Sequence, residues 1–168
     1  YKRQGMESWF HRETASLSGG QKQLLNLAAV LTLQPDVLIL DEPTAQLDPI
    51  AAADFLAALA RVNRELGTTV LLSEQRLEEA LPLSDRAVVL DGGAVLAHGA
   101  PRAVGAQLRT AGHELFRAMP AAMRVWAAVE NDLPCPVSVR EGRDWLADFA
   151  ASHPLKSLPE RPLPAPSE

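Results

Sequence analysis

Two adjacent carboxylates, Asp41 and Glu42, follow a short apolar run at residues 37–40. The run has the length and composition of a buried parallel strand, and a strand holds the side chains at its tip in a fixed direction. In phosphoryl-transfer sites, an aspartate in this position binds the phosphate-bound Mg²⁺, usually through water. A carboxylate one residue later can align or deprotonate the attacking water. We therefore assign Asp41 to a metal ion and Glu42 to water. The alternative is that Asp-Glu-Pro-Thr only forms a turn and caps a helix.

A second group suited to phosphate chemistry is Ser18, Gly19, Gly20 and Gln21, which stands before an amphipathic run. Glycines let a phosphate approach the backbone closely, and a helix N-terminus offers free amides and a dipole that favours anions. The Ser18 hydroxyl and the Gln21 side chain can add contacts. For an isolated Ser-Gly-Gly the alternative is a flexible turn with a serine cap. The acidic strand end that follows favours phosphate binding.

Hydrophobic periodicity predicts the elements that position these residues. We predict a helix from Ser18 that ends at residues 34–36, a strand at residues 37–40, a helix capped by Asp48 that ends before Gly67, a strand at residues 68–73, a short helix that stops near Pro82, a hairpin around residues 91–93, a helical stretch interrupted by Pro120, and a helix from about Ser138. The order indicates an α/β fold with parallel strands, flanking helices and a C-terminal β-hairpin. Its reactive residues stand at the carboxyl ends of strands.

Composition limits the function classes. The chain has 168 residues, 47% of them hydrophobic and 22% charged, which is sufficient for a packed core. The net charge of −5 argues against binding to nucleic acid, which normally needs a basic face. The single cysteine excludes an internal disulfide and fits a reducing compartment. No apolar stretch reaches the roughly 18 residues of a membrane span, so we expect any membrane association to be peripheral.

The segments "LSGGQ" and "LILDEPTAQLD", separated by a helix, resemble the signature motif, Walker B strand and D-loop of ATP-binding cassette (ABC) ATPases. The resemblance implies a partial P-loop NTPase fold and ATP and Mg²⁺ as ligands. Two such domains enclose two ATP molecules in this family, so Ser18, Gly19, Gly20 and Gln21 are implied to contact the ATP of a partner cassette. Asp48 is implied to lie at the dimer seam.

The family's Walker A loop, "GxxxxGK[ST]", does not occur in these residues, and we expect it upstream. Residues 1–106 are then the C-terminal part of an ABC ATPase domain, residues 107–152 a helical linker or accessory region, and residues 153–168 a proline-rich flexible linker. The implied enzyme is a transport-coupled ATPase. Residues 1–168 alone are expected to be inactive.

One position departs from the family pattern. Members usually carry a histidine after the strand that corresponds to "TVLLS", where it contacts the γ-phosphate, and Gln75 aligns with that position. A glutamine amide can donate to a phosphate, but it cannot become a cation or carry a proton. We expect Gln75 to act at the catalytic site and to make that site slow. The alternative is a polar residue at a helix start with no role.

The segment "SEQRLEEALPLSDRAVVLDGGAVLAHGAP" resembles energy-coupling-factor importers, and "PCPVSVREGRDWL" resembles the linker of their fused double-cassette form. This resemblance implies import of vitamins, their precursors or metal ions from the cytoplasmic face of the cell membrane. Its implied partners are a second ATPase half, a transmembrane coupling subunit and a substrate-binding membrane subunit. An unrelated helical appendage is the alternative for the tail. A non-transport twin-cassette ATPase that acts on ribosomes or DNA is the alternative for the whole protein.

Overall fold

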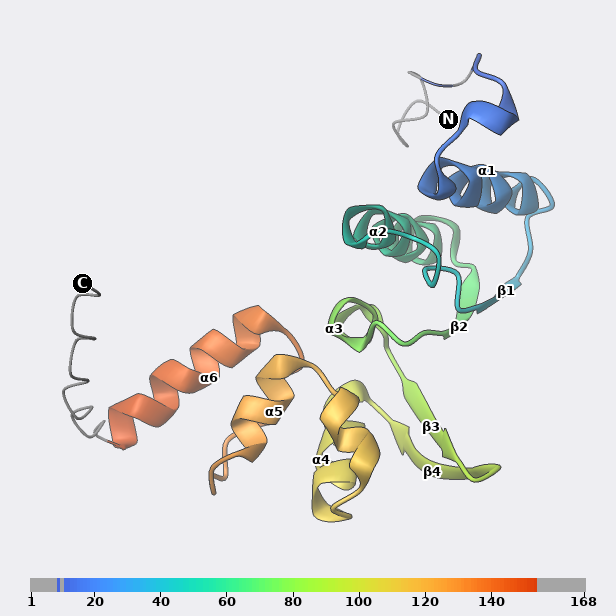
Figure 1. Cartoon of the computed structure of the whole chain (residues 1–168). Coiled ribbons are helices and arrows are strands. Elements are labelled where there is room, and N and C mark those ends of the chain that lie inside the picture. The colour runs from blue at the N-terminus through green and yellow to red at the C-terminus, as the bar shows by residue number, and fades with distance from the viewer. Residues whose placement is uncertain (1–8, 10, 154–168) are drawn as a thin grey trace, which may run out of the picture.

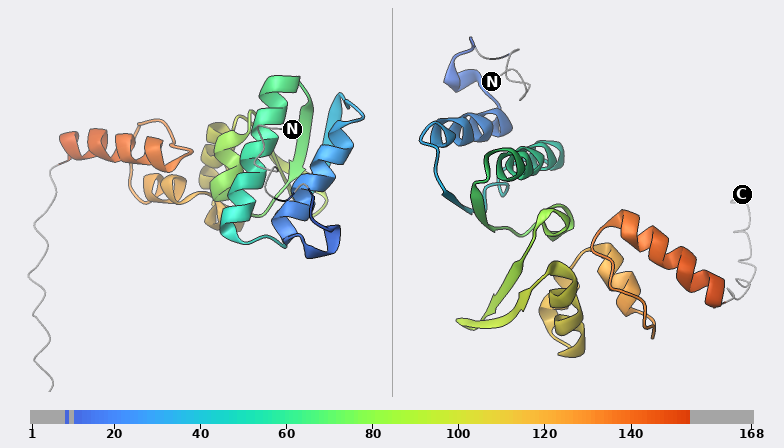
Figure 2. Two further views of the ribbon diagram at one scale, coloured as in Figure 1. Left: turned by 90° about the horizontal axis from the view of Figure 1, so that it is seen from above. Right: turned by 180° about the vertical axis from the view of Figure 1, so that it is seen from behind.

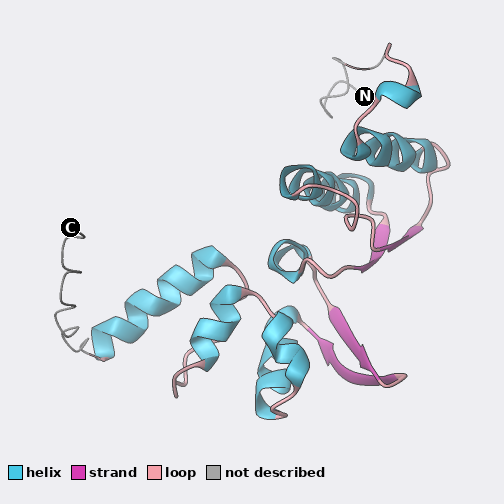
Figure 3. Ribbon diagram, viewed as in Figure 1, coloured by secondary structure: helices cyan, strands magenta, loops and turns pink. Residues whose placement is uncertain are grey.

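The computed structural model of the chain describes residue 9 and residues 11–153. Helices and strands alternate along residues 19–91, and within the described residues only helices follow residue 99 (Figures 1 and 3). The α/β class with parallel strands is confirmed. The elements are η1 (Thr14–Ser16), α1 (Gly19–Leu31), β1 (Val37–Asp41), α2 (Pro49–Leu66), β2 (Thr69–Ser73), α3 (Leu77–Ala80), η2 (Leu81–Leu83), β3 (Ala87–Asp91), β4 (Ala94–Gly99), α4 (Pro101–Thr110), η3 (Glu114–Ala118), α5 (Ala121–Ala127) and α6 (Val139–Ser152). Residues 154–168 of the predicted proline-rich linker lie outside the described part.

Local sequence determines where the first two long helices begin and end. Ser18 is the N-cap of α1, and its hydroxyl accepts a hydrogen bond from the backbone N–H of Gln21. Asp48 is the N-cap of α2 and Pro49 occupies its first turn, where a missing N–H has no cost. Gly67 ends α2 with a φ of 70°, a left-handed conformation that glycine adopts without strain. These three boundaries agree with the sequence prediction.

Strands β1 and β2 pair in parallel, with Val37 opposite Thr69 and Asp41 opposite Ser73. The prediction that residues 37–40 form a buried strand is wrong for one face of the pair. Ile39 is 70% exposed and Leu71 is 60% exposed, whereas Leu38 is buried. The reason is that, among the described residues, these strands pair only with each other, and α1 and α2 cover one side of them (Figure 1).

Strands β3 and β4 form an antiparallel hairpin, as predicted. Its turn consists of Gly92 and Gly93, whose φ angles of 54° and 80° favour glycine. The register shifts between Val89 and Leu90, where Leu96 of β4 is left without a partner, which marks a bulge in β4. Helix α4 then packs back onto the hairpin, which places Val104 and Leu108 in its core.

Two main hydrophobic clusters divide the described chain, and α3 with η2 connects them. Ala80 belongs to the cluster under α1, α2 and β1, and the next residue, Leu81, belongs to the cluster formed by the hairpin and α4 to α6. Helices α5 and α6 lie side by side and far from α1 (Figure 2). Gly142 permits this contact, because a Cβ there would lie 2.9 Å from the Ala122 Cβ.

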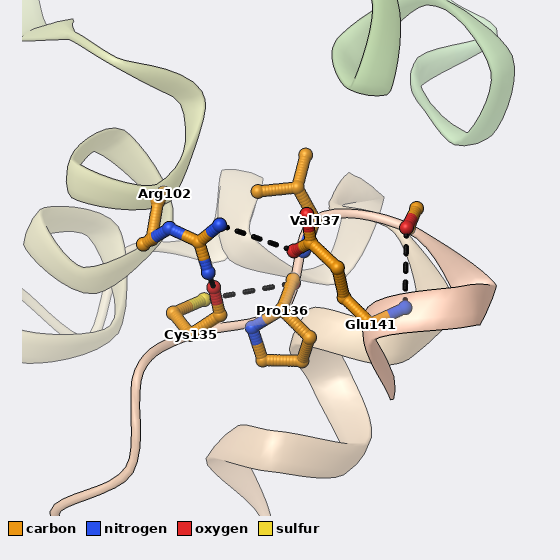
Figure 4. Close-up of polar contacts among 6 residues, drawn as sticks. Arg102, Cys135, Pro136, Val137 and Glu141 are labelled. Carbon is orange, nitrogen blue, oxygen red and sulfur yellow. Dashed lines mark hydrogen bonds and ion pairs between the residues drawn. The ribbon is translucent and has the colours of Figure 1, made fainter. Parts of the chain in front are cut away.

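A polar network joins α4 to the start of α6 (Figure 4). The Arg102 guanidinium donates to the Cys135 carbonyl and forms an ion pair of 3.2 Å with Glu141 Oε2. The same oxygen accepts the backbone N–H of Val137 at 2.8 Å, and the Ser138 hydroxyl caps α6 by accepting the Glu141 N–H. Burial raises the pKa of the Cys135 thiol to about 11, against weaker opposing effects of Arg102 and Arg109. The segment before α6 is therefore bound to α4 by backbone as well as side-chain contacts.

Every helix in the described ranges is too short or too polar to cross a lipid bilayer.

Candidate functional site

The paired ends of β1 and β2 bring the predicted catalytic residues together. Because the strands are parallel and in register, Asp41 lies opposite Ser73 at the carboxyl edge of the pair. The Ser73 hydroxyl donates a short hydrogen bond to Asp41 Oδ1. Its oxygen also accepts the backbone N–H of Glu42 at 3.1 Å. One serine thus orients the first carboxylate and the backbone of the second.

Glu42 and Gln75 meet directly. The Gln75 side-chain amide donates to Glu42 Oε1 at 2.7 Å, and both residues are exposed. Glu42 has a φ of 42°, so the extended backbone of β1 ends at Asp41. A non-glycine residue in this conformation costs about 1 to 2 kcal/mol and persists only where its surroundings hold it. Here the holding contacts come from Ser73 and Gln75, so the position of the Glu42 carboxylate depends on the end of β2.

A second polar connection between the same loops has no counterpart in the sequence prediction. Thr44 is fully buried, and its hydroxyl donates to Glu74 Oε2 at 2.7 Å. The other oxygen of Glu74 accepts the backbone N–H groups of Gln75 and Arg76 at 3.1 and 3.3 Å. Arg76 in turn donates to the Leu47 carbonyl at 2.8 Å. A polar residue directly after a strand was the only signal for Glu74, and it does not identify these partners.

The N-terminus of α1 carries a capping box. The Ser18 hydroxyl accepts the Gln21 N–H at 3.2 Å, and Gln21 Oε1 accepts the Ser18 N–H at 2.9 Å. This arrangement is the serine cap that the sequence left open as an alternative. It does not use up the donors of these side chains, since a hydroxyl that accepts can still donate, and an amide that accepts through oxygen keeps its –NH₂. Both groups can therefore still bind an anion.

The two glycines of this turn have different surroundings. A Cβ at Gly20 would lie 2.9 Å from the Ala51 Cβ, so Gly20 allows α1 and α2 to approach closely. A Cβ at Gly19 would make only ordinary contacts, the nearest being 3.7 Å from Leu47, and Gly19 is exposed. Packing within the chain thus explains why residue 20 is a glycine. It leaves Gly19 available for a ligand that approaches the backbone.

Asp48 is engaged with its own helix. Its Oδ1 accepts the backbone N–H groups of Ile50 and Ala51, both at 3.0 Å, which confirms the predicted cap. The residue is exposed, and its role at a dimer seam stays a prediction. Leu47, at the end of the loop between Asp41 and Asp48, lies beside Gly19 and accepts from Arg76, so this loop connects the N-terminus of α1 with the residue that follows Gln75.

The described side chains supply only part of a Mg²⁺ site. Asp41 offers an exposed carboxylate, the oxygen ligand that Mg²⁺ prefers. Within residues 9 and 11–153, no group of three or more His, Cys, Asp or Glu side chains could hold a metal ion by itself. Mg²⁺ commonly binds through one or two carboxylates together with substrate phosphates, and a single Asp41 suits that mode.

Comparisons with known proteins found similarity to ABC transporter proteins. Residues 2–45 match the family model described as ABC transporter. A Bacillus anthracis protein named as an ABC transporter ATP-binding protein is 46% identical over 151 residues, which are 88% of this chain and 26% of that protein. The chain therefore spans about a quarter of the length of this relative.

Two solved structures are similar to the chain in three dimensions. One is cbiO1 from Clostridium perfringens, described as part of the ABC transporter complex cbiONQ, with a TM-score of 0.58 and 35% identity over 66% of this chain and 45% of that one. The other, a nucleotide-free ATP-binding cassette from an ABC transporter, has a TM-score of 0.56 and 22% identity over 76% of this chain and 46% of that one, and shows the fold alone. The family match, the relative and the likeness to cbiO1 together support the assignment of this chain to the ABC transporter ATPase family.

Proposed function

We propose that this chain forms part of an ATP-binding and ATP-hydrolysing subunit of a transporter. The observation that carries the proposal is the meeting of Asp41, Glu42 and Gln75 at the carboxyl edge of a parallel strand pair. Ligands in open α/β sheets bind at such edges. The exposed Glu42 carboxylate accepts from Gln75 through one oxygen and has the other free of this bond, so it can accept a proton from water.

Each residue has a distinct proposed role. Asp41 would hold the Mg²⁺ that accompanies ATP. When bound, that ion would neutralise phosphate charge. Glu42 aligns the attacking water and accepts its proton. Gln75 positions Glu42 and can donate to a phosphate oxygen, but it cannot supply a positive charge. We propose that this site therefore hydrolyses ATP slowly.

Ser18, Gly19, Gly20 and Gln21 serve a different ATP molecule in this proposal. They are the exposed or half-exposed start of α1, at the positive end of the helix dipole. The capping box uses the backbone N–H groups of Ser18 and Gln21 and leaves those of Gly19 and Gly20 for an anion. We assign them to the nucleotide held by a second cassette, with Asp48 at the seam between the two. Residues 1–168 contain no "GxxxxGK[ST]" loop, so we expect no ATP hydrolysis from these residues alone.

The transporter class that we propose is an energy-coupling-factor importer of vitamins, their precursors or metal ions. The likeness to cbiO1, which is described as part of a transporter complex, supports this class. The proposed partners are a second cassette, fused or separate, a transmembrane coupling subunit and a substrate-binding membrane subunit, on the cytoplasmic face of the membrane. The alternative is a twin-cassette ATPase that acts on ribosomes or DNA, and the net charge of −5 disfavours it.

Two measurements on the intact protein test the proposal. ATP hydrolysis should fall by about 100-fold or more in Glu42→Gln, because this change removes the proton acceptor and keeps its shape. Glu79→Gln removes the same charge from α3 and should leave hydrolysis unchanged. Purification from membranes should recover integral membrane subunits. Recovery of ribosomes or DNA in their place would favour the alternative, and equal hydrolysis by Glu42→Gln and the wild type would reject the site.

A further inference from the structure

Glu74 connects two loops of the chain around the proposed catalytic residues. One carboxylate oxygen accepts the hydroxyl of the fully buried Thr44, in the loop after β1. The other accepts the backbone N–H groups of Gln75 and Arg76, in the loop after β2. The side chain is half-buried, so water competes less for these bonds than at an exposed position. One carboxylate therefore fixes the distance between two loops that carry Glu42 and Gln75.

The connection extends to the start of α2. Arg76, whose backbone N–H is bound by Glu74, donates from its guanidinium to the Leu47 carbonyl at 2.8 Å. Leu47 is buried and precedes Asp48, the cap of α2. The loop after β2 is thus attached to the loop after β1 at two points, once through Thr44 and once through Leu47.

These contacts restrict the position of Gln75. Its side chain is exposed, and its bond to Glu42 is the only hydrogen bond of that side chain recorded within the described residues. A glutamine side chain on the surface normally samples several rotamers, so a single bond would not hold it. The backbone N–H of Gln75, however, donates to Glu74. This bond restricts the backbone position from which the Gln75 side chain extends.

We infer that Glu74 is a positioning residue for ATP hydrolysis: with Thr44, it holds the backbone of Gln75 so that the Gln75 amide meets Glu42. The inference rests on the proposed function. Glu74 itself does not touch the Glu42 carboxylate. It acts through Gln75, and its loss leaves the reacting groups in place but loosely aligned.

Three variants of the intact protein separate this role from a general effect on folding. Glu74→Ala removes both sets of bonds. Glu74→Gln keeps them, because its amide oxygen can accept the two backbone N–H groups and its –NH₂ can donate to the Thr44 hydroxyl. Thr44→Val removes one donor at nearly constant volume. Glu79→Ala is the matched control, a half-buried glutamate on α3.

We expect Glu74→Ala to lower kcat for ATP by about tenfold or more, with KM within about twofold, since misalignment of reacting groups acts on kcat. Thr44→Val should show a smaller loss in the same direction, and Glu74→Gln and Glu79→Ala should match the wild type. In a Gln75→Ala background the effect of Glu74→Ala should shrink to about twofold or less, because the residue it positions is gone.

Amide hydrogen exchange gives a readout independent of turnover. Peptides that contain Gln75 and Arg76 should exchange about tenfold faster in Glu74→Ala, while peptides from α2 keep the wild-type rate. Unchanged turnover in Glu74→Ala, an undiminished effect without Gln75, or faster exchange throughout α2 overturns the positioning role. If wild-type hydrolysis is present and Glu42→Gln removes it, the proposed function stands whatever Glu74→Ala does. An intact protein that hydrolyses no ATP overturns both.

Discussion

The side-chain amide of Gln75 donates a 2.7 Å hydrogen bond to Oε1 of Glu42. The bond joins the ends of two strands that are paired in parallel, one residue beyond Asp41 on β1 and two beyond Ser73 on β2. A glutamine amide is neutral at every physiological pH, so this contact orients Glu42 without compensating its charge. A protonated histidine at position 75 would form an ion pair with the same carboxylate and could also donate to a phosphate.

The first prediction is that Gln75→His raises turnover. In the intact protein we expect kcat for ATP to increase about tenfold, which is below the range for a complete acid–base group because Glu42 is already present. Steady-state hydrolysis at saturating ATP measures the effect. Gln75→Asn is the control, since it keeps the amide and shortens its reach, and it should lower kcat. No gain in Gln75→His would contradict the view that glutamine makes this site slow.

The second prediction separates the roles of the two glycines at the N-terminus of α1. Gly19→Ala should leave thermal stability nearly unchanged, because the added Cβ has room, while it should weaken the ATP site that we propose this turn completes. Gly20→Ala should destabilise the protein by about 1 to 3 kcal/mol, since its Cβ would lie 2.9 Å from that of Ala51. Thermal unfolding and ATP hydrolysis of the intact protein measure the two effects.

Ala51→Gly supplies the control for Gly20→Ala. Removal of the opposing Cβ should restore part of the lost stability if the clash between α1 and α2 is the cause. A Gly19→Ala protein that is as unstable as Gly20→Ala would show that packing, and no ligand, accounts for both glycines.

Sequence patterns identified the helix ends well because the signals are local. Ser18, Asp48 and Gly67 each act within a few residues, and each stands where it was predicted. The pairing of β1 with β2 was also predictable, since two apolar runs joined by one helix form a parallel pair. Helix α4 was not predicted, because it has only 10 residues and Gly105 interrupts its short apolar stripe.

The missed features depend on contacts between distant residues. An apolar run such as residues 37–40 indicates that a strand can be buried. The 70% exposure of Ile39, however, depends on which other elements cover the strand. The bond between Thr44 and Glu74 joins residues 30 positions apart, and neither residue type specifies the other. Sequence reasoning therefore found the residues at the strand tips and missed the one that holds them in place.

The third prediction distinguishes the cap at Ser18 from phosphate binding. Ser18→Asp keeps a good N-cap acceptor, so stability should change little, but its negative charge would repel a phosphate and hydrolysis should fall sharply. Ser18→Ala removes the cap and should cost about 1 kcal/mol of stability. Unfolding curves and ATP hydrolysis of the intact protein are the measurements. Normal hydrolysis in Ser18→Asp would show that the serine only caps α1.

The fourth prediction concerns pH. Burial between α4 and α6 raises the pKa of the Cys135 thiol from 9.0 to about 11, so the folded protein keeps the proton over a range in which the unfolded chain loses it. The thiol therefore contributes full stability below about pH 9, and this contribution is lost as the pH rises toward about 11. Over that interval the free energy of unfolding should fall more steeply in the wild type than in Cys135→Ala, which starts from lower stability because of the cavity. Denaturant unfolding at a series of pH values measures both slopes.

At pH 7 to 8 the same burial should make Cys135 react with a thiol reagent only at the rate of unfolding. Rapid labelling of the folded protein would show that the segment before α6 is not held against α4.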